Sequence, residues 1–184
     1  MFEILILSLA LSMDAFAVSI GLGIKENQNI KVLALKVALF FGIFQAFMPF
    51  IGYIGGIGLQ EYIYGFDKII AFALLLLIGA KMIFEAVNEN VEEEITKISN
   101  KILLTLAIAT SIDAMAAGFT LNLLDLNPFI SMLIIGIVTL VFSFIGVFIG
   151  TKGGTFLEDK AEKIGGVILI GIGLKILIEH LFFH

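Results

Sequence analysis

Six apolar runs in this chain are each about as long as a helix that crosses a lipid bilayer, which takes roughly 20 residues. The predicted spans are residues 4–24, 32–57, 69–87, 102–123, 129–150 and 164–183. Hydrophobic residues make up 60% of the 184 residues and charged residues 15%, whereas soluble domains carry about a quarter charged residues. The sequence therefore predicts an all-α membrane protein, in which residues 1–184 form a single transmembrane domain of six transmembrane helices.

The first run is expected to be a transmembrane helix rather than a cleaved signal peptide. No basic segment precedes it, and Asp14 lies in its middle. The chain contains no cysteine, and its only histidines are His180 and His184 at the C-terminal end. These absences exclude disulfides and any thiolate or multi-histidine metal site inside the membrane.

Two of the apolar runs carry a carboxylate within a repeated motif. The first copy reads LSMDAFAVS at residues 11–19 and the second reads TSIDAMAAG at 110–118, so Asp14 matches Asp113. A carboxylate at the bilayer centre costs about 2.5–3.5 kcal/mol on insertion scales, and such residues are usually functional. We expect the two aspartates to share one site. The alternative is that each is protonated, or is bonded to a neighbouring helix as a packing contact.

The two halves of the chain match beyond the aspartates, which indicates a tandem duplication of three helices. The tripeptide FIG occurs at residues 50–52 and at 144–146, and another glycine follows each copy four residues on. The glycines expected to mark close helix contacts are Gly52, Gly56, Gly146 and Gly150. Because three is an odd number, the second copy would be inverted in the membrane, as in many secondary transporters. The predicted organisation is repeat one at 1–87, a cytoplasmic linker at 88–101 and repeat two at 102–184.

Lysine placement predicts the orientation of the chain in the membrane. Eight lysines lie in or beside the first, third and fifth loops, whereas Lys68 alone lies in the second and fourth loops. The positive-inside rule therefore places the odd-numbered loops in the cytoplasm and both termini outside.

Oxygen atoms dominate the polar groups close to the two aspartates in sequence or in the neighbouring span. The candidate metal-binding residues are Asp14, Asp113, Ser12, Ser111 and Gln45. Oxygen ligands suit Mg²⁺, Ca²⁺ and Mn²⁺ better than Cu⁺ or Zn²⁺. Two roles stay open for Gln45, a neutral ligand and an interhelical hydrogen bond.

A lysine and a glutamate recur at a spacing of four residues in each repeat. The two pairs are Lys81 with Glu85 and Lys175 with Glu179. They are expected to form ion pairs near the membrane surface, with a gating or proton-coupling role as the alternative. The middle of the membrane would then hold no cation, which disfavours an amino acid zwitterion as the substrate.

The sequence has no nucleotide-binding motif, no nucleophile constellation and no basic groove for nucleic acid. It predicts a transporter rather than an enzyme, without a cofactor, driven by an ion gradient or by the membrane potential. The expected partners are a divalent metal ion as substrate and the lipid bilayer. A homo-oligomer stays open, as does a non-transporting scaffold that recruits partners through residues 88–101.

Three segments resemble the MntP manganese efflux pumps, a family within the lysine-exporter-like superfamily: LSMDAFA at 11–17, ATSIDAM at 109–115 and GGVILIGIG at 165–173. The resemblance spans essentially the whole chain. It implies a manganese(II) exporter of the prokaryotic cytoplasmic (inner) membrane, with Asp14 and Asp113 at the ion site. Some members carry a glutamate where this chain has Gln45, which leaves this site one charge short. A sporulation-associated branch shares the motifs, so the alternatives are another divalent cation, a small solute, or no metal transport.

Overall fold

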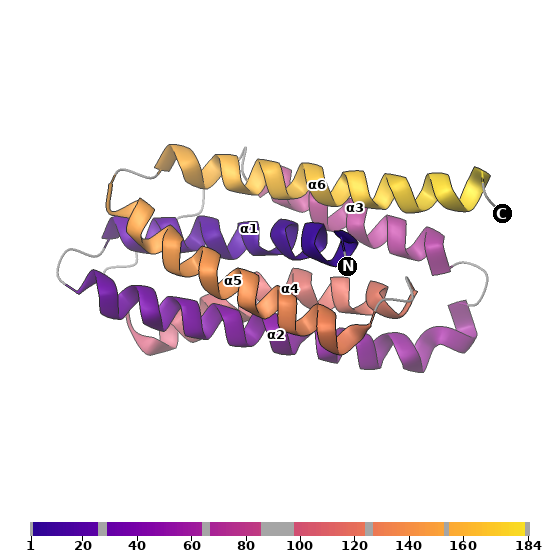
Figure 1. Cartoon of the computed structure of the whole chain (residues 1–184), viewed down its shortest axis with the longest axis horizontal. Coiled ribbons are helices and arrows are strands. Elements are labelled where there is room, and N and C mark those ends of the chain that lie inside the picture. The colour runs from indigo at the N-terminus through magenta and orange to yellow at the C-terminus, as the bar shows by residue number, and fades with distance from the viewer. Residues whose placement is uncertain are drawn as a thin grey trace.

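The structure is a computed structural model of the chain, and it describes residues 2–25, 29–63, 67–85, 98–123, 127–152 and 155–182. These residues form the helices α1 (Phe2–Lys25), α2 (Ile30–Ile63), α3 (Asp67–Glu85), α4 (Asn100–Leu123), α5 (Pro128–Gly150) and α6 (Thr155–Phe182). The helices run along the long axis of an elongated bundle, and α1 begins toward the same end at which α6 ends (Figure 1). The all-helical prediction is confirmed.

Several helix boundaries differ from the predicted spans. α6 begins at Thr155, so Lys160 and Lys163 belong to the helix, and the expectation that they lie in a loop is wrong. α2 likewise extends to Ile63. An apolar run marks only the part of a helix that faces lipid, whereas lysine and glutamate are good helix formers and continue the helix beyond it. α4 begins at Asn100, inside the predicted linker, of which residues 88–97 lie outside the described residues.

The turn that precedes α5 shows how the sequence fixes the start of a helix. The side-chain oxygen of Asn127 accepts a hydrogen bond from the backbone N–H of Ile130 at 3.1 Å. Pro128 follows at the first helical position, where a missing N–H costs nothing. α5 therefore begins where the Asn-Pro pair predicts.

Each helix packs mainly against helices from the other half of the chain. α1 lies against α5, α5 against α2, α2 against α4, α4 against α3, α3 against α6, and α6 against α1. Contacts within one half, of α1 with α2 and of α4 with α5, are much smaller. The two halves are therefore interlocked rather than arranged as two separate three-helix bundles.

Close helix contacts recur at matching positions of the two halves. A Cβ atom added at Gly52 of α2 would collide with the carbonyl oxygen of Met115 in α4. A Cβ added at Gly146 of α5 would lie 3.0 Å from the carbonyl oxygen of Phe16 in α1. Met115 and Phe16 each follow a motif aspartate by two residues. Glycine is what lets the backbones approach this closely.

The second glycine of each pair continues these contacts one turn further along. A Cβ atom at Gly56 would lie 3.2 Å from the carbonyl oxygen of Phe119, and one at Gly150 would collide with that of Ile20. Phe119 and Ile20 again occupy equivalent positions, six residues after the aspartates. The four glycines thus line the α2–α4 and α1–α5 contacts.

The bundle buries polar as well as apolar side chains and exposes many large apolar ones. Among the described residues, the buried polar and charged side chains are those of Ser8, Ser12, Ser19, Gln45, Thr110, Ser111, Asp113, Thr120, Ser131, Thr139 and Ser143. Large apolar side chains such as Leu77, Phe84 and Phe129 are 66–68% exposed. Within the described residues, α1, α2, α4 and α5 each contain a stretch long and apolar enough to cross a membrane. This distribution suits a molecule surrounded by lipid, and we conclude that the chain is an integral membrane protein.

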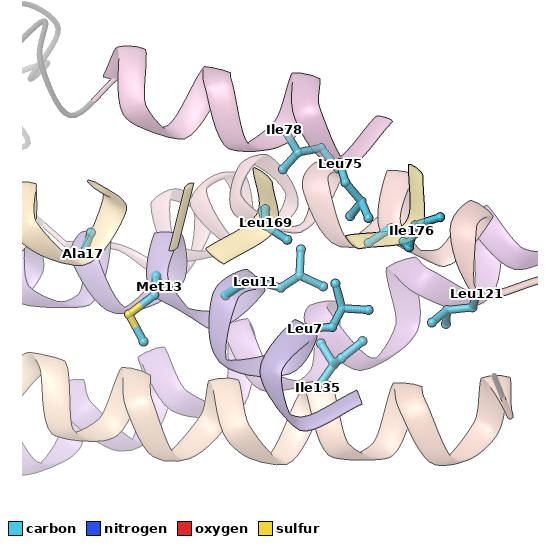
Figure 2. Packing of buried hydrophobic residues seen from close by; sticks show 12 residues of the cluster. Leu7, Leu11, Met13, Ala17, Leu75, Ile78, Leu121, Ile135, Leu169 and Ile176 are labelled. Carbon is cyan, nitrogen blue, oxygen red and sulfur yellow. The ribbon is translucent and has the colours of Figure 1, made fainter. Parts of the chain in front are cut away.

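Apolar side chains join the two halves around α1. In Figure 2, Leu7 and Leu11 of α1 lie among Leu75 of α3, Ile135 of α5 and Leu169 of α6. None of these five side chains is more than 3% exposed. Because the cluster draws on both halves, neither half can bury its own share alone.

Residues 1–87 and 102–184, expressed as separate chains, are each expected to be unstable in the membrane. Their principal helix contacts are to the other half, so each alone exposes surfaces that the whole chain buries. Co-expression of the two pieces should restore a complex that is purified through a tag on either one. The amount of each piece in the membrane fraction provides the measurement. A single piece that accumulates and resists proteolysis would contradict the interlocked arrangement.

Gly52→Ala is expected to lower the free energy of unfolding by about 1–3 kcal/mol, because the added methyl group meets a backbone carbonyl. Gly55→Ala is the matched control, since a Cβ atom there meets nothing within 4 Å. Thermal unfolding in detergent micelles compares the two variants. Equal melting temperatures would argue against a close α2–α4 contact.

Candidate metal site at the crossing of the motif helices

The Asp113 carboxylate, in the middle of α4, forms an ion pair with Lys81 of α3. Lys81 Nζ lies 3.2 Å from Oδ1 and 3.2 Å from Oδ2, and donates to both. The Asp113 side chain is 10% exposed, whereas that of Lys81 is 45% exposed. A buried charge without a partner is strongly destabilising, and Lys81 supplies that partner.

This contact corrects one expectation drawn from the sequence. Lys81 does form an ion pair, but the expectation that no lysine comes near the two aspartates is wrong. The four-carbon side chain reaches across from α3 to α4, and the spacing of residues along α3 gives no indication of that direction. Lys175 is an exposed residue of α6. The side chains of Glu85 and Glu179 lie outside the described residues, so the pairs within each helix stay predictions.

Gln45 of α2 bridges the two helices that carry the aspartate motifs. Its fully buried side chain donates from Nε2 to the Leu11 carbonyl of α1 at 3.2 Å and to the Thr110 carbonyl of α4 at 3.4 Å. Leu11 and Thr110 each precede a motif aspartate by three residues. Gln45 therefore ties equivalent points of the two motifs together.

The two acceptors also fix which end of the Gln45 amide is free. Both are carbonyl oxygens, so the amide nitrogen must face them and Oε1 must point away. Oε1 is buried and has no hydrogen-bond partner among the described residues. Of the two roles expected for Gln45, the interhelical hydrogen bond is present, and Oε1 leaves the ligand role open.

The serines that precede the aspartates make equivalent hydrogen bonds. Ser12 Oγ donates to the Leu9 carbonyl at 2.8 Å, and Ser111 Oγ donates to the Ile108 carbonyl at 3.0 Å. Both serines are fully buried. Each hydroxyl donates its hydrogen bond within its own helix, so the lone pairs of its oxygen stay available to another partner.

Asp14 lies in the middle of α1 and is half-buried. Its neighbours on the same helix face, Ala10 and Ala17, are small and fully buried. α1 contacts α4, and the Gln45 side chain holds the two helices together one turn before each carboxylate. The two aspartates therefore belong to helices that are joined close to both of them.

A cation bound here would draw on neutral oxygens as well as on carboxylates. No group of three or more His, Cys, Asp or Glu side chains is placed to hold a metal ion in the part of the chain that the structure describes. Oxygens with free lone pairs are nevertheless at hand in Ser12, Ser111 and Gln45. A set of carboxylate, hydroxyl and amide oxygens suits Mg²⁺, Ca²⁺ or Mn²⁺.

Thr139 and Ser143 of α5 were not among the predicted site residues. Their hydroxyl oxygens are buried and have no hydrogen-bond partner among the described residues. The repeat contained a signal for Thr139: aligning residues 50–52 with 144–146 places it opposite Gln45. A polar residue at the same point of an apolar run in both halves indicates a polar interior.

Residues 28–177 match a protein family described as "Putative manganese efflux pump". The chain belongs to this family. The relative from Aliarcobacter butzleri, named "Putative manganese efflux pump MntP", is 68% identical over 97% of this chain and 99% of its own length. Proteins of the same name from Saccharophagus degradans and, numbered MntP 1, from Wolinella succinogenes are 54% and 52% identical. They cover 96% and 100% of this chain and 98% and 100% of their own lengths.

The family match confirms the resemblance that the aspartate motifs indicated. An efflux pump is a transporter rather than an enzyme, and the long apolar helices agree with that description. No solved structure matches the chain.

Gln45→Leu is expected to lower the free energy of unfolding by about 1 kcal/mol, because it removes two interhelical hydrogen bonds of the size measured in membrane bundles. Thr139→Val is the matched control. It removes a buried hydroxyl without a partner among the described residues, and should change stability by less than about 0.5 kcal/mol. Thermal or denaturant unfolding in micelles measures both. A Gln45→Leu protein as stable as the parent would show that the bridge contributes nothing to the packing of α1 and α4.

Proposed function

We propose that this chain exports manganese(II) from the cytoplasm by secondary transport, and that Asp14 and Asp113 bind the ion near the middle of the membrane. The observation that carries the proposal is the Gln45 bridge, which joins α1 and α4 one turn before each aspartate. Membership of a family described as a manganese efflux pump supports the choice of ion. The supporting ligands in this proposal are the oxygens of Ser12, Ser111 and Gln45.

The proposed architecture is a single domain of six transmembrane helices built as two inverted repeats, 1–87 and 102–184, joined by a cytoplasmic linker at 88–101. The matching glycine contacts support this, since α2 meets α4 as α5 meets α1. The equivalent serine hydrogen bonds of the two motifs support it as well. In transporters of this kind the substrate site lies at the interface between the repeats.

Alternating access in such folds is a movement of one repeat against the other around a fixed site. The pairs α1–α6 and α3–α4 are equivalent by the repeat, yet α1 packs against α6 much more extensively than α3 packs against α4. This difference supports a conformation in which the bundle is packed more tightly toward one face of the membrane than toward the other. The α3–α4 contact is the natural place for a movement, because less packing is lost there.

The proposed location is the cytoplasmic (inner) membrane of a prokaryotic cell, with the odd-numbered loops inside and both termini outside. The lysine distribution supports this orientation. The positions of the start of α1 and the end of α6, toward one end of the bundle, agree with an even number of crossings (Figure 1). The driving force would be an ion gradient or the membrane potential, since the sequence has no nucleotide-binding motif.

A second candidate keeps the site and changes the cargo to another hard divalent cation. Carboxylate, hydroxyl and amide oxygens also suit Mg²⁺ and Ca²⁺. A zwitterionic solute is less well supported. The family is described as a manganese efflux pump, which names a metal cation rather than a zwitterion.

Asp14→Asn and Asp113→Asn are each expected to reduce Mn²⁺ flux by at least about tenfold, because a metal ligand and its charge are lost. Flux is measured in proteoliposomes with Mn²⁺, Mg²⁺ and Ca²⁺ in parallel, with and without a pH gradient. Asp67→Asn, at the first residue of α3, is the control and should retain flux. Undiminished Mn²⁺ flux in either motif variant would overturn the two-aspartate site. Absence of Mn²⁺ flux in the unmodified protein would overturn manganese export.

A further inference from the structure

The Lys81 ammonium occupies the position on Asp113 that a bound cation would need. Nζ lies at an equal distance, 3.2 Å, from both carboxylate oxygens. A divalent cation held by the two oxygens of one carboxylate sits in the same place, at a shorter distance. Lys81 and a cation therefore cannot both bind there.

The exposure of the two partners suggests which one is able to leave. Asp113 is almost enclosed, whereas nearly half of the Lys81 side chain is exposed. Lysine is a compact charge on a flexible four-carbon stem, and it can withdraw without unfolding its helix. Asp113 has less freedom to withdraw, because its side chain is short and α4 is packed extensively against α2.

The ion pair also spans a sparsely packed contact between the two halves. Lys81 belongs to α3 and Asp113 to α4, and these helices share little other contact compared with α1 and α6. Releasing the pair removes an attraction at a place where movement costs less packing than it would between α1 and α6. Replacement of the Lys81 ammonium by a metal cation on Asp113 would therefore weaken the contact between α3 and α4.

We propose that Lys81 is a tethered competitor of the transported cation. It neutralises Asp113 while the site is empty, is displaced when the cation binds, and returns when the cation leaves. This inference rests on the proposed function, because it assumes that Asp113 binds the cargo. The buried Asp113 carboxylate then always has a positive partner, so the empty protein returns to the loading side without a bare charge at Asp113.

The test compares Lys81→Met and Lys81→Arg in the full-length protein. Mn²⁺ binding is measured by calorimetry in lipid nanodiscs, and turnover by flux in proteoliposomes. Without a competing charge, Lys81→Met should bind Mn²⁺ about tenfold more tightly, yet its turnover should fall because the empty site is left unneutralised. Arginine pairs with both carboxylate oxygens through two N–H groups, so Lys81→Arg should raise the Kd several-fold.

Lys36→Met is the matched control. Lys36 also links two helices, donating to Asn100 Oδ1 at 3.2 Å, but it is exposed and its partner is the first residue of α4, 13 residues before Asp113. Its removal should leave both the Kd and the turnover unchanged.

The order of the Kd values separates a competitor from a structural lysine. A structural role predicts that Lys81→Met binds Mn²⁺ more weakly and that Lys81→Arg resembles the parent. Either result would overturn the inference.

If Lys81→Met fails to fold, the Lys81→Arg protein decides alone, since an unchanged or lower Kd for Mn²⁺ contradicts competition. If the parent protein exports Mn²⁺ but the Lys81 variants show the Kd values expected of a structural lysine, only this inference is refuted. A parent protein without Mn²⁺ flux refutes the proposed function as well.

Discussion

The lipid core offers no water, so each polar group that the aspartate motifs bring into the membrane must find its partner inside the bundle. The structure provides these partners in two ways. Ser12 and Ser111 turn their hydroxyl protons to carbonyls of their own helices, which needs no neighbour. Asp113 and the motif carbonyls depend on other helices, through Lys81 of α3 and Gln45 of α2. The arrangement of the helices must therefore bring α2 and α3 to the motifs.

This requirement explains why the halves interlock. Lys81 and Gln45 belong to the first half of the chain, and they serve Asp113 and the Thr110 carbonyl in the second. Such short polar contacts need close backbones, which glycine permits: Gly52 brings α2 against α4 beside the second motif. Apolar packing alone would not select this arrangement in a bilayer, because lipid tails cover apolar side chains equally well. The small residues and the polar bridges act together to specify which helices meet.

The sequence predicts the helices and the motifs well because each depends on local properties. Apolar runs locate the spans, and the repeat aligns Asp14 with Asp113 and Thr139 with Gln45. The Lys81–Asp113 contact could not be predicted in the same way. It depends on the rotation of α3 about its axis and on α3 lying beside α4, and neither is contained in a hydrophobic pattern. The start of α6 at Thr155 was missed for a related reason, since polar helix turns outside the lipid leave no apolar run.

The neutral amide of Gln45 is consistent with the charges around it. Its Nε2 must donate to two carbonyl oxygens, which an ionised carboxylate at this position could not do. With a neutral residue there, two aspartates and one divalent cation sum to zero once Lys81 has withdrawn. A loaded site without net charge avoids the cost of holding an excess charge in the bilayer. A glutamate in place of Gln45 would add a negative charge and call for a compensating proton or lysine. In the proposed mechanism, then, Gln45 ties α1 to α4, and its neutrality allows a two-carboxylate site to hold a divalent cation without leaving an excess charge.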